Sequence, residues 1–551
     1  MPKPDELLEL LLANRNIGDE DRDKFLNPSY DKGIHNPYLM KDMEKAVVRI
    51  FEAIEAKEKI IIYSDYDCDG IPAAVIMHDF FKKIGYENFS VYIPDRHDEG
   101  YGLNLKAIDE FIDTGVNLII TFDLGITAIE EITKAKSAGI DTIVTDHHLP
   151  QDRLPDAFAI INPKQKDCNY PDKNLCGAGI AFKLVCAIIK KYGEYFKIPD
   201  GWEKWLLDMA SVATLADQVP LVGENRILAY YGLKVLKKTR RPGLIEIFNK
   251  AGVNMNNISE EDITFTLAPR INAASRMGDP MDAFRALSSE NPVEAKAFAD
   301  HLSKINDERK QSVARIMKDV NKTLEKREDK SVIVIGNPNW RVGILGLVAS
   351  KIVDQYKRTT FVWGSEGSEI IRGSCRGYGD INLVEAMSAL PTNSLIDFGG
   401  HKGAGGFSVE HTEIHFLEER LLKVFDGITD KKLESVDIPI DAKINLDDVN
   451  IGNYNVIEKL APYGEGNPKP IFLLEDITIS SIKEFGKDKN HLEIIFLDEK
   501  AHPVKAISFF KTRNDFGRSL TEGERINLYA TFEKSTFLGR TELRLRIVDI
   551  I

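Results

Sequence analysis

Short apolar runs alternate with stretches of helical periodicity between residue 46 and about residue 165. The runs are rich in β-branched side chains, and the segments between them place apolar residues on one helical face. Strands that alternate with helices predict a mainly parallel sheet covered by helices, which is an α/β fold. The expected strands span residues 59–64, 89–93, 117–122, 141–145 and 157–161.

The pattern is mainly helical on both sides of this region. Residues 1–45 predict a helical lead-in, and residues 166–330 predict further helices. The segment 291–329 is charged and has no glycine or proline after Pro292. It repeats apolar residues at helical spacing, which predicts one long helix. Such a helix is either a solvated surface helix or a connection between two domains, and we favour the connection.

Two further patterns follow the long helix. Residues 331–430 restart an α/β pattern with the apolar run 331–336. From about residue 437, short strands with turn signals predict a small all-β barrel, with the single-strand-binding OB type as the leading candidate. The expected barrel strands span residues 437–444, 471–482, 491–497, 504–510, 525–532 and 541–550.

Composition places the chain among soluble globular proteins, with 43% hydrophobic and 29% charged residues. The N-terminus lacks a basic segment followed by an apolar core, and no apolar run approaches the ~18 residues of a membrane span. Five cysteines without a C-x-x-C pair predict free thiols in a reducing cytoplasm. The net charge of −14 argues against a general nucleic-acid coat protein, but it is compatible with a nuclease whose basic contacts are local.

Three aspartates, Asp65, Asp67 and Asp69, alternate at the end of the first expected strand and precede Gly70. Alternation places the three carboxylates on one side of an extended segment, where they repel one another unless a cation lies between them. An EF-hand loop begins in the same way, but it needs a Glu at its twelfth position, which is Ile76 here, and a preceding helix. The segment therefore predicts a metal site of another kind.

Two other expected strands also end in potential metal ligands. Asp123 follows the third strand, and Asp146, His147 and His148 follow the fourth. The carboxyl ends of parallel strands meet at one edge of a sheet, so these side chains are expected near Asp65. A single aspartate at a strand end is about as often a helix N-cap, but three neighbouring strand ends favour a ligand site.

The expected ligands combine carboxylates with imidazole, which suits Mn²⁺ somewhat better than Mg²⁺. Several aspartates that can bridge predict two ions, roughly 3.5–4 Å apart, and phosphoester hydrolysis as the reaction. Asp217 ends an apolar helix at residues 205–217, and spacing alone leaves it either a helix cap or another ligand.

Four motifs in the first half resemble, in order, those of the DHH phosphoesterases, and a later one resembles the glycine-rich signature of the DHH-associated domain. Two further segments are similar to the bacterial RecJ family of single-strand exonucleases within that group. The motifs are Asp65–Gly70, Asp123 with Gly125, Asp146–His148, Ala216–Leu221 and Gly399–Phe407, and the two segments are Leu267–Arg276 and Ala461–Pro470.

The resemblance implies a metal-dependent 5′-to-3′ exonuclease that hydrolyses single-stranded DNA in repair and recombination. It implies a DHH catalytic domain at 46–290, a connecting helix at 291–330, a DHH-associated domain at 331–430 and an OB domain at 437–551. The implied ligands of two Mn²⁺ or Mg²⁺ ions are Asp65, Asp67, Asp123, His147 and Asp217. Asp69 and Asp146 are implied as supporting groups, and His148 as a catalytic contact to the phosphate.

The strand-binding residues are expected mainly in the DHH-associated domain. Arg372, Ser374 and Arg376 alternate at the end of an apolar stretch, which suits binding phosphates from one side, although an exposed edge strand with ordinary charges is the other interpretation. Glycines at 399–406 would let backbone amides approach a phosphate. With the resemblance, the expected strand-binding set is Arg276, Arg372, Ser374, Arg376, Gly400 and His401.

Three positions depart from the family pattern. Tyr63 stands where some RecJ proteins carry a metal-binding histidine, Arg341 follows Trp340 where the family has histidine, and Gly377 stands where serine is common. The Tyr63 departure affects which residues coordinate the second metal ion. The Arg341 and Gly377 departures affect how the protein binds the DNA strand.

The barrel region carries aromatic residues among lysines and an arginine, and these are either core residues or surfaces on which bases stack. They are Phe485, Phe509, Phe510 and Phe537, among Lys487, Lys489, Lys511 and Arg513.

Two other functions compete with the exonuclease. A DHH hydrolase of short oligonucleotides or cyclic dinucleotides resembles only the first two domains, so residues 437–551 argue against it. A non-catalytic single-strand-binding scaffold would have lost metal ligands, whereas all five expected positions are intact. The expected partner is single-stranded DNA, with a single-strand binding protein and a helicase as candidate protein partners, no membrane and a monomeric state.

Overall fold

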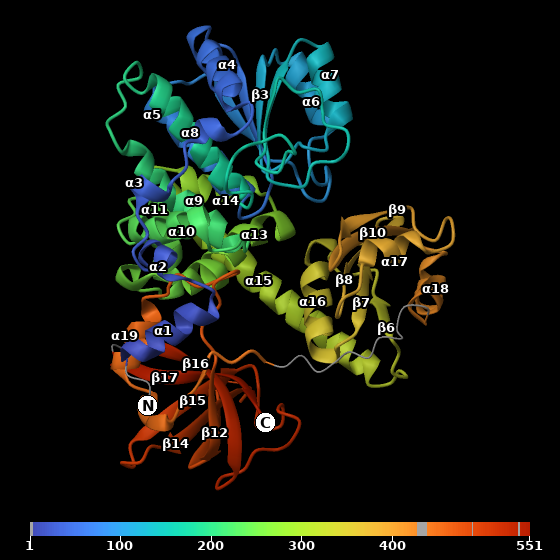
Figure 1. Ribbon diagram of the computed structural model, residues 1–551. Coiled ribbons are helices and arrows are strands. Elements are labelled where there is room, and N and C mark those ends of the chain that lie inside the picture. The colour runs from blue at the N-terminus through green and yellow to red at the C-terminus, as the bar shows by residue number, and fades with distance from the viewer. Residues whose placement is uncertain (1–3, 427–437, 488, 538–539) are drawn as a thin grey trace. The chain divides into compact units, whose positions relative to one another are not determined.

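The computed structural model describes residues 4–426, 438–487, 489–537 and 540–551, and the chain divides into two compact units. One unit comprises residues 37–217 and 234–435 and contains two α/β domains (Figure 1). The other brings together residues 1–36, 218–233 and 436–551 and contains an all-β domain.

The first sheet has five strands, all parallel, in the order β2-β1-β3-β4-β5. Its strands are β1 (Ile60–Ser64), β2 (Phe89–Tyr92), β3 (Leu118–Phe122), β4 (Asp141–Thr145) and β5 (Ala159–Ile161). All five expected strands are therefore confirmed, with ends that differ by at most two residues. The two central strands β1 and β3 are buried over their whole length, as the β-branched runs predicted.

Helices cover both faces of this sheet, because each parallel crossover lays a helix on one of them. One face packs on α6 (Leu105–Asp113) and α7 (Ile129–Ser137) through a core that includes Tyr63 and Ile119. The other face carries α4 (Met43–Glu55), α5 (Gly70–Lys83) and α8 (Gly177–Tyr192) (Figure 1).

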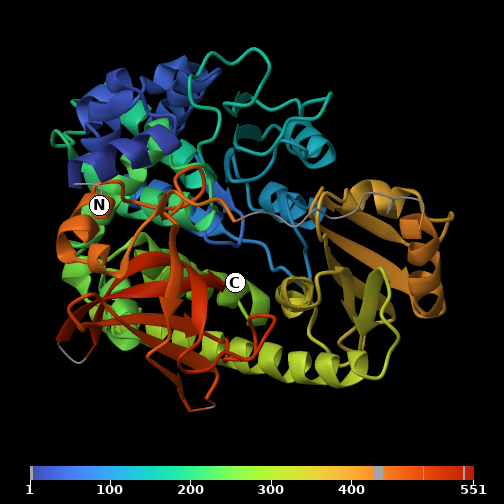
Figure 2. The same cartoon turned by 60° about the horizontal axis from the view of Figure 1, so that its bottom comes forward.

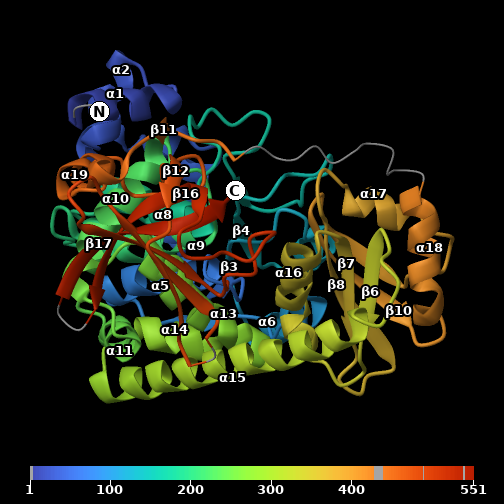
Figure 3. The same ribbon diagram turned by 90° about the horizontal axis from the view of Figure 1, so that it is seen from below.

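Besides α8, further helices make up most of the chain between β5 and the first strand of the second sheet, as expected for residues 166–330. They are η2 (Trp202–Leu206), α9 (Leu207–Ala216), α10 (Gly223–Leu236), α11 (Pro242–Ala251), η3 (Met255–Asn257), α12 (Glu260–Asp262), the π-helical segment η4 (Ile263–Leu267), α13 (Ala268–Met277) and α14 (Met281–Ser288). The single long helix predicted at 291–329 is confirmed as α15 (Pro292–Leu324). Asn291 caps it by accepting hydrogen bonds from the amides of Val293 and Glu294. The helix continues without interruption to the second sheet (Figures 2 and 3).

The second sheet has the order β6-β7-β8-β10-β9, with β6 and β7 parallel and the other neighbours antiparallel. Its strands are β6 (Val332–Gly336), β7 (Thr359–Gly364), β8 (Ile370–Arg376), β9 (Asp397–His401) and β10 (Ala404–Glu410). Helix α16 (Leu345–Tyr356), preceded by η5 (Val342–Ile344), packs with α15 on one face. Helices α17 (Leu383–Ser388) and α18 (Ile414–Asp426) cover the other face.

One interpretation of this domain needs correction. Strand β8 lies between β7 and β10, so the edge-strand interpretation of residues 372–376 is wrong. The glycine-rich segment 399–406, for which the sequence predicted no secondary structure, belongs largely to the β9–β10 pair, with β9 at the sheet edge and exposed over its whole length.

The all-β domain is one seven-stranded sheet in the order β11-β12-β16-β17-β15-β14-β13. Its strands are β11 (Ala442–Lys443), β12 (Phe472–Thr478), β13 (Ser481–Phe485), β14 (His491–Leu497), β15 (Pro503–Phe509), β16 (Arg525–Phe537) and β17 (Arg540–Ile550). The strand predicted at 471–482 is wrong as one element, because β12 ends at Thr478 and the chain turns into β13. The strand predicted at 437–444 shrinks to β11, and residue 437 lies outside the described residues.

Helices complete this unit: α1 (Pro4–Asn14), α2 (Asp19–Leu26), α3 (Tyr30–Gly33), most of α10, η6 (Leu446–Asp448) and α19 (Ile451–Glu458). The short helix η1 (Pro37–Leu39) belongs to the first unit, where it contacts α4 and α8. Leucines of α1, among them Leu8 and Leu11, share one hydrophobic core with the sheet. All five cysteines are free, as expected. Within the described ranges, no helix has both the length and the hydropathy that crossing a bilayer requires.

Candidate active site

Three motif aspartates occupy equivalent places at the carboxyl edge of the first sheet. The backbone amides of Asp65, Asp123 and Asp146 each donate to the carbonyl of the last residue of the neighbouring strand, at 3.2, 3.0 and 3.1 Å. Each motif therefore begins one residue beyond its strand, and the hydrogen-bond ladder aligns them. The expectation that the three motifs meet at one edge is confirmed.

The turn after β1 depends on Gly70, because a Cβ there would lie 2.5 Å from the carbonyl oxygen of Asp65. Oδ1 of Asp67 accepts from the amides of Asp69 and Gly70, at 2.8 and 3.1 Å, which holds the turn. Asp69 in turn accepts from the first two amides of α8, at 2.6 and 2.7 Å. The positive end of that helix dipole favours the carboxylate there.

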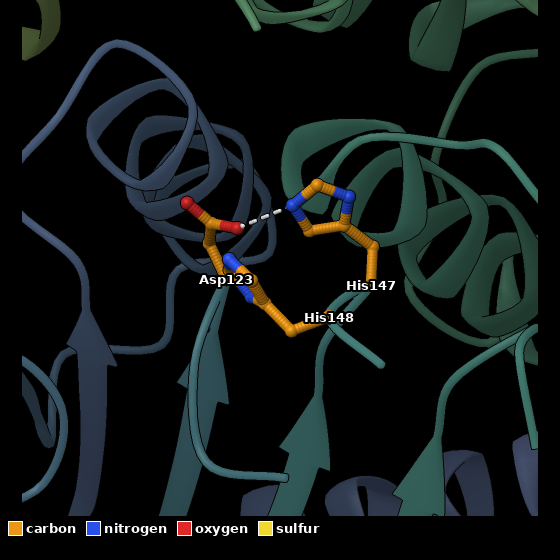
Figure 4. A group of neighbouring side chains, drawn as sticks. All are labelled: Asp123, His147 and His148. Carbon is orange, nitrogen blue, oxygen red and sulfur yellow. Dashed lines mark ion pairs between the residues drawn. The ribbon is translucent and has the colours of Figure 1, made fainter. Parts of the chain in front are cut away.

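Carboxylate and imidazole side chains form three clusters that share some members. Within each cluster, the potential ligand atoms lie within 4.8 Å of one another. The clusters are Asp65, Asp67 and Asp123; Asp69, His147 and Asp217; and Asp123, His147 and His148. Nε2 of His147 lies 3.0 Å from Oδ1 of Asp123 (Figure 4) and 3.8 Å from Oδ2 of Asp217. The structure thus brings together all five expected ligands. It also places Asp69, expected only as a supporting group, 3.6 Å from the same nitrogen.

The electrostatics of the cluster favour a bound cation. Burial, reinforced by Asp67, raises the pKa of Asp65 well above its usual value, and burial with the charge of Asp69 does the same for Asp123. The same two causes raise the pKa of Asp217 to about 8. Without a cation these carboxyl groups bind protons, and a divalent ion can replace those protons.

The surroundings of the two histidines favour opposite protonation states. Burial, followed by the charge of His148, lowers the pKa of His147 to about 3, so its ring is neutral. Burial also opposes the charge on His148, but the hydrogen bond between its Nδ1 and Asp146, at 2.8 Å, outweighs it and raises the pKa. His147 therefore suits a metal ligand, and His148 suits a contact to an anion.

The residues fit a divalent metal by an independent criterion. Oδ1 of Asp65, Oδ1 of Asp123 and Nδ1 of His147 are buried side-chain atoms without a hydrogen-bond partner. Leaving such an atom unpaired costs about 1–3 kcal/mol. Mn²⁺ readily binds both carboxylate oxygens and a neutral imidazole. Mg²⁺ binds mainly to oxygen, so it would use chiefly the carboxylates of this site.

We expect divalent metal to raise the Tm of the protein more at pH 8 than at pH 5.5, by a few degrees. Folding raises the pKa of Asp69 to about 6 and that of Asp217 to about 8. The folded protein therefore holds these two protons more tightly than the unfolded chain does. The resulting stabilisation is fully present below about pH 4 and is lost as the pH rises through 6 and 8. Metal takes the place of the lost protons, so its stabilisation grows over the same range. Thermal unfolding with Mn²⁺ or with chelator across this range measures the difference, and an equal rise at both pH values would contradict it.

The arginines expected on β8 share one face of the sheet. A Cβ at Gly346, in the first turn of α16, would lie 2.9 Å from Nη2 of Arg376 and 3.7 Å from Oγ of Ser374. These two side chains therefore lie together over the start of that helix, where an anion is favoured. Arg372 is exposed and donates instead to the carbonyl of His97, at 3.0 Å.

The remaining strand-binding candidates are more dispersed. Arg276 is half-buried and donates to the carbonyl of Gly343 at 3.2 Å, and its partial burial together with neighbouring arginines lowers its pKa to about 10. His401 lies on the exposed edge strand β9, and no contact in the described residues joins it to the arginines. Gly400 has a φ of +142°, and a Cβ there would lie 2.4 Å from the carbonyl oxygen of Ala404, so only glycine fits.

Two residues of the connection between β2 and α6 escaped the sequence analysis. The hydroxyl of Tyr101 lies 3.4 Å from Nδ1 of His148 and from the carbonyl of Asp123, while the residue as a whole is 54% exposed. Arg96 lies over the ring of Tyr66 and contributes to the lowered pKa of Arg276. No motif marks this connection, and its cluster of charged residues was the only signal available.

Two of the three family departures lie away from the metal ligands. Tyr63 is fully buried, and its hydroxyl donates to the carbonyl of Gly102 and accepts from Asn104, so it belongs to the core rather than to a metal shell. Arg341 is exposed, and its guanidinium lies 3.8 Å from the sulfur of Met277.

Part of the aromatic group expected in the all-β domain is accessible. Phe510 is 79% exposed, and its ring contacts His491, which also contacts Phe485 and Phe509. Arg546 lies 4.2 Å from the ring centre of Phe509. The side chain of Phe537 lies outside the described residues.

Three segments match known protein families. Residues 59–214 match the N-terminal domain of the DHH family, residues 329–428 match the DHHA1 domain, and residues 440–549 match the RecJ OB domain.

Whole-chain relatives give the same result. The chain is 34% identical to the single-stranded-DNA-specific exonuclease RecJ of Bacillus subtilis over 98% of its length and 67% of that protein. It is 31% identical to the RecJ exonuclease of Haemophilus influenzae, over 94% of the chain and 92% of that protein. The crystal structure of Thermus thermophilus RecJ in complex with Mn²⁺ has the same fold, with a TM-score of 0.82 at 24% identity over 99% of the chain and 76% of that protein.

Proposed function

The chain belongs to the RecJ family of single-stranded-DNA-specific exonucleases, and from this premise we propose that it removes nucleotides from the 5′ end of single-stranded DNA with two Mn²⁺ or Mg²⁺ ions. The observation that carries the proposal is the convergence of carboxylates and one neutral imidazole at the edge of the first sheet. The proposed ligands are Asp65, Asp67, Asp123, His147 and Asp217, with Asp69 as an additional candidate.

When bound, the ions would activate water and stabilise negative charge on the phosphate oxygens. The chain's own groups have separate tasks. His148, whose protonated form is favoured by the hydrogen bond to Asp146, would donate to a phosphate oxygen. Arg276, Ser374 and Arg376 would bind a neighbouring phosphate of the strand, and the exposed ring of Tyr101 would lie against a base at the site of cleavage.

The two competing functions have less support. A hydrolase of very short substrates has no evident need for an OB domain, which this chain carries at residues 440–549. A binding scaffold without catalysis has no need for a cluster of buried carboxylates with raised pKa values. The proposed substrate is single-stranded, which further suggests a helicase or a single-strand binding protein as the source of the strand and the cytoplasm as the location.

A strand labelled at either end tests the direction of cleavage and the need for metal. We expect the 5′ label to appear first as a short product with Mn²⁺ or Mg²⁺, a chelator to abolish digestion, and blunt duplex DNA to persist. The 3′ label should remain on long products until late in the reaction. Early release of the 3′ label would overturn the direction, and digestion restricted to di- and trinucleotides would favour the short-substrate hydrolase.

A further inference from the structure

Two contacting helices, α13 and α15, carry several buried polar atoms without a hydrogen-bond partner, outside the active site described above. The two helices contact each other, and Figure 3 shows them side by side. Ser303, Asn306 and Arg309 follow one another at intervals of three residues, so they share one face of α15. Arg309 interacts electrostatically with Arg270 of α13, which places this face against α13.

Several polar atoms of this group have no partner. Nε of Arg270 and Nε of Arg309 are buried and make no hydrogen bond, and neither does the amide of Asn306 or the hydroxyl of Ser303. Asn306 is 0% exposed and Ser303 is 4% exposed. The guanidinium of Arg309 forms no hydrogen bond or ion pair with any residue that the structure describes. Unpaired buried groups of this kind are costly, so their retention calls for a ligand or ordered water.

The charges point to an anionic ligand. Burial lowers the pKa of Arg309, and the positive charge of Arg270 adds to the effect. Burial likewise lowers the pKa of Arg270, and the one acidic group that acts on it is Asp307. Arg309 also lowers the pKa of Arg276, which in turn lies near Arg96 and Arg376. The positive charge therefore continues from the proposed phosphate-binding arginines to Arg270.

An exposed aromatic ring lies at the end of this band. Arg270 donates through Nη1 to the carbonyl of Thr266, so its guanidinium lies against the π-helical segment η4. Phe265, the residue before Thr266, is 74% exposed. Alternating cationic and aromatic surfaces are what single strands bind, because phosphates pair with the charges and bases stack on the rings.

We propose that Arg270 and Arg309 form a second phosphate-binding subsite for single-stranded DNA, next to Arg276, with Phe265 as a stacking surface. The inference rests on the proposed function, because it extends the path of the same strand. Asn306 and Ser303 lie three and six residues before Arg309 on the same face of α15 and offer further unpaired polar groups on that face. The subsite binds the backbone without reading the base sequence, as a nuclease of broad sequence range requires.

Strand binding in the presence of chelator tests the subsite apart from hydrolysis. We expect Arg309→Gln to weaken binding of a fluorescent oligothymidylate about tenfold, because a charge-assisted hydrogen bond is lost. The slope of log affinity against log salt should fall by about 0.7, the value for one phosphate contact in a single strand. Because the Arg309 guanidinium makes no hydrogen bond or ion pair with the described residues, its replacement by glutamine should leave the metal-induced rise in Tm unchanged.

Two companion variants make the result specific. Arg315→Gln removes an exposed arginine from the same helix and should change neither the affinity nor the slope. Phe265→Ala should weaken binding several-fold without changing the slope, because stacking involves no counterion release. Wild-type affinity and slope in Arg309→Gln would overturn the subsite and leave ordered water as the partner of these groups. A wild-type protein that binds the strand but does not cleave it would overturn the proposed function alone.

Discussion

Replacement of Asp123 by asparagine should reduce metal-dependent hydrolysis of single-stranded DNA on the order of 10³-fold or more. Loss of a residue that merely hydrogen-bonds to a metal ligand already lowers activity by ~10–100-fold, and loss of a ligand itself should cost more. Asp123 takes part in two of the three ligand clusters, and its Oδ1 is buried without a hydrogen-bond partner. The variant removes the charge that a divalent ion requires. Initial rates of digestion with Mn²⁺, measured at saturating strand, give the size of the loss.

Asparagine is the appropriate replacement because of the backbone at this position. Asp123 has a φ of +63°, in the left-handed region that asparagine adopts more easily than alanine. A change in the chain's conformation is therefore avoided, and strand binding in chelator should be retained. The matched control is Asp113→Asn, at the exposed end of α6, which should digest DNA at the wild-type rate. Activity of Asp123→Asn within a few-fold of wild type would remove Asp123 from the proposed ligands.

Replacing each of the two adjacent histidines by alanine should have different effects on hydrolysis and on metal binding. His147→Ala should abolish both hydrolysis and most of the metal-induced rise in Tm, because its neutral ring faces three carboxylates. His148→Ala should keep the metal-induced rise in Tm and lose about 10²-fold in rate, the typical contribution of one group that donates to the reacting phosphate.

The folded structure supports this separation. Asp146 loses its ring partner in His148→Ala but keeps hydrogen bonds from three backbone amides, those of Ile126, His147 and His148. Its position, and hence the turn that carries His147, should persist. His415→Ala, an exposed histidine on α18, is the control for the loss of an imidazole. If both active-site variants lost the metal response equally, His148 would have to be counted among the ligands.

The sequence alone determined the parts of this protein that depend on neighbours in the chain. Runs of β-branched residues specify strands through local sterics, so all five strands of the first sheet were predictable. Ligand types at the ends of such strands are predictable for the same reason, because parallel strands end at one edge. The meeting of Asp65, Asp123 and His147 at this edge was therefore predictable without a structure. Spacing could not decide whether Asp217 is a helix cap or a metal ligand, because it ends a helix rather than a strand.

Tertiary structure alone decided what depends on residues far apart in the sequence. Packing of α1 against the all-β sheet joins the two ends of the chain in one core, which no local pattern indicates. The placement of Tyr63 in the core, the position of Tyr101 beside His148, and the unpaired face shared by Asn306 and Arg309 also became visible only in the fold. Burial and long-range charge set these properties. Both depend on which surfaces meet, and a linear pattern of residues carries no record of that.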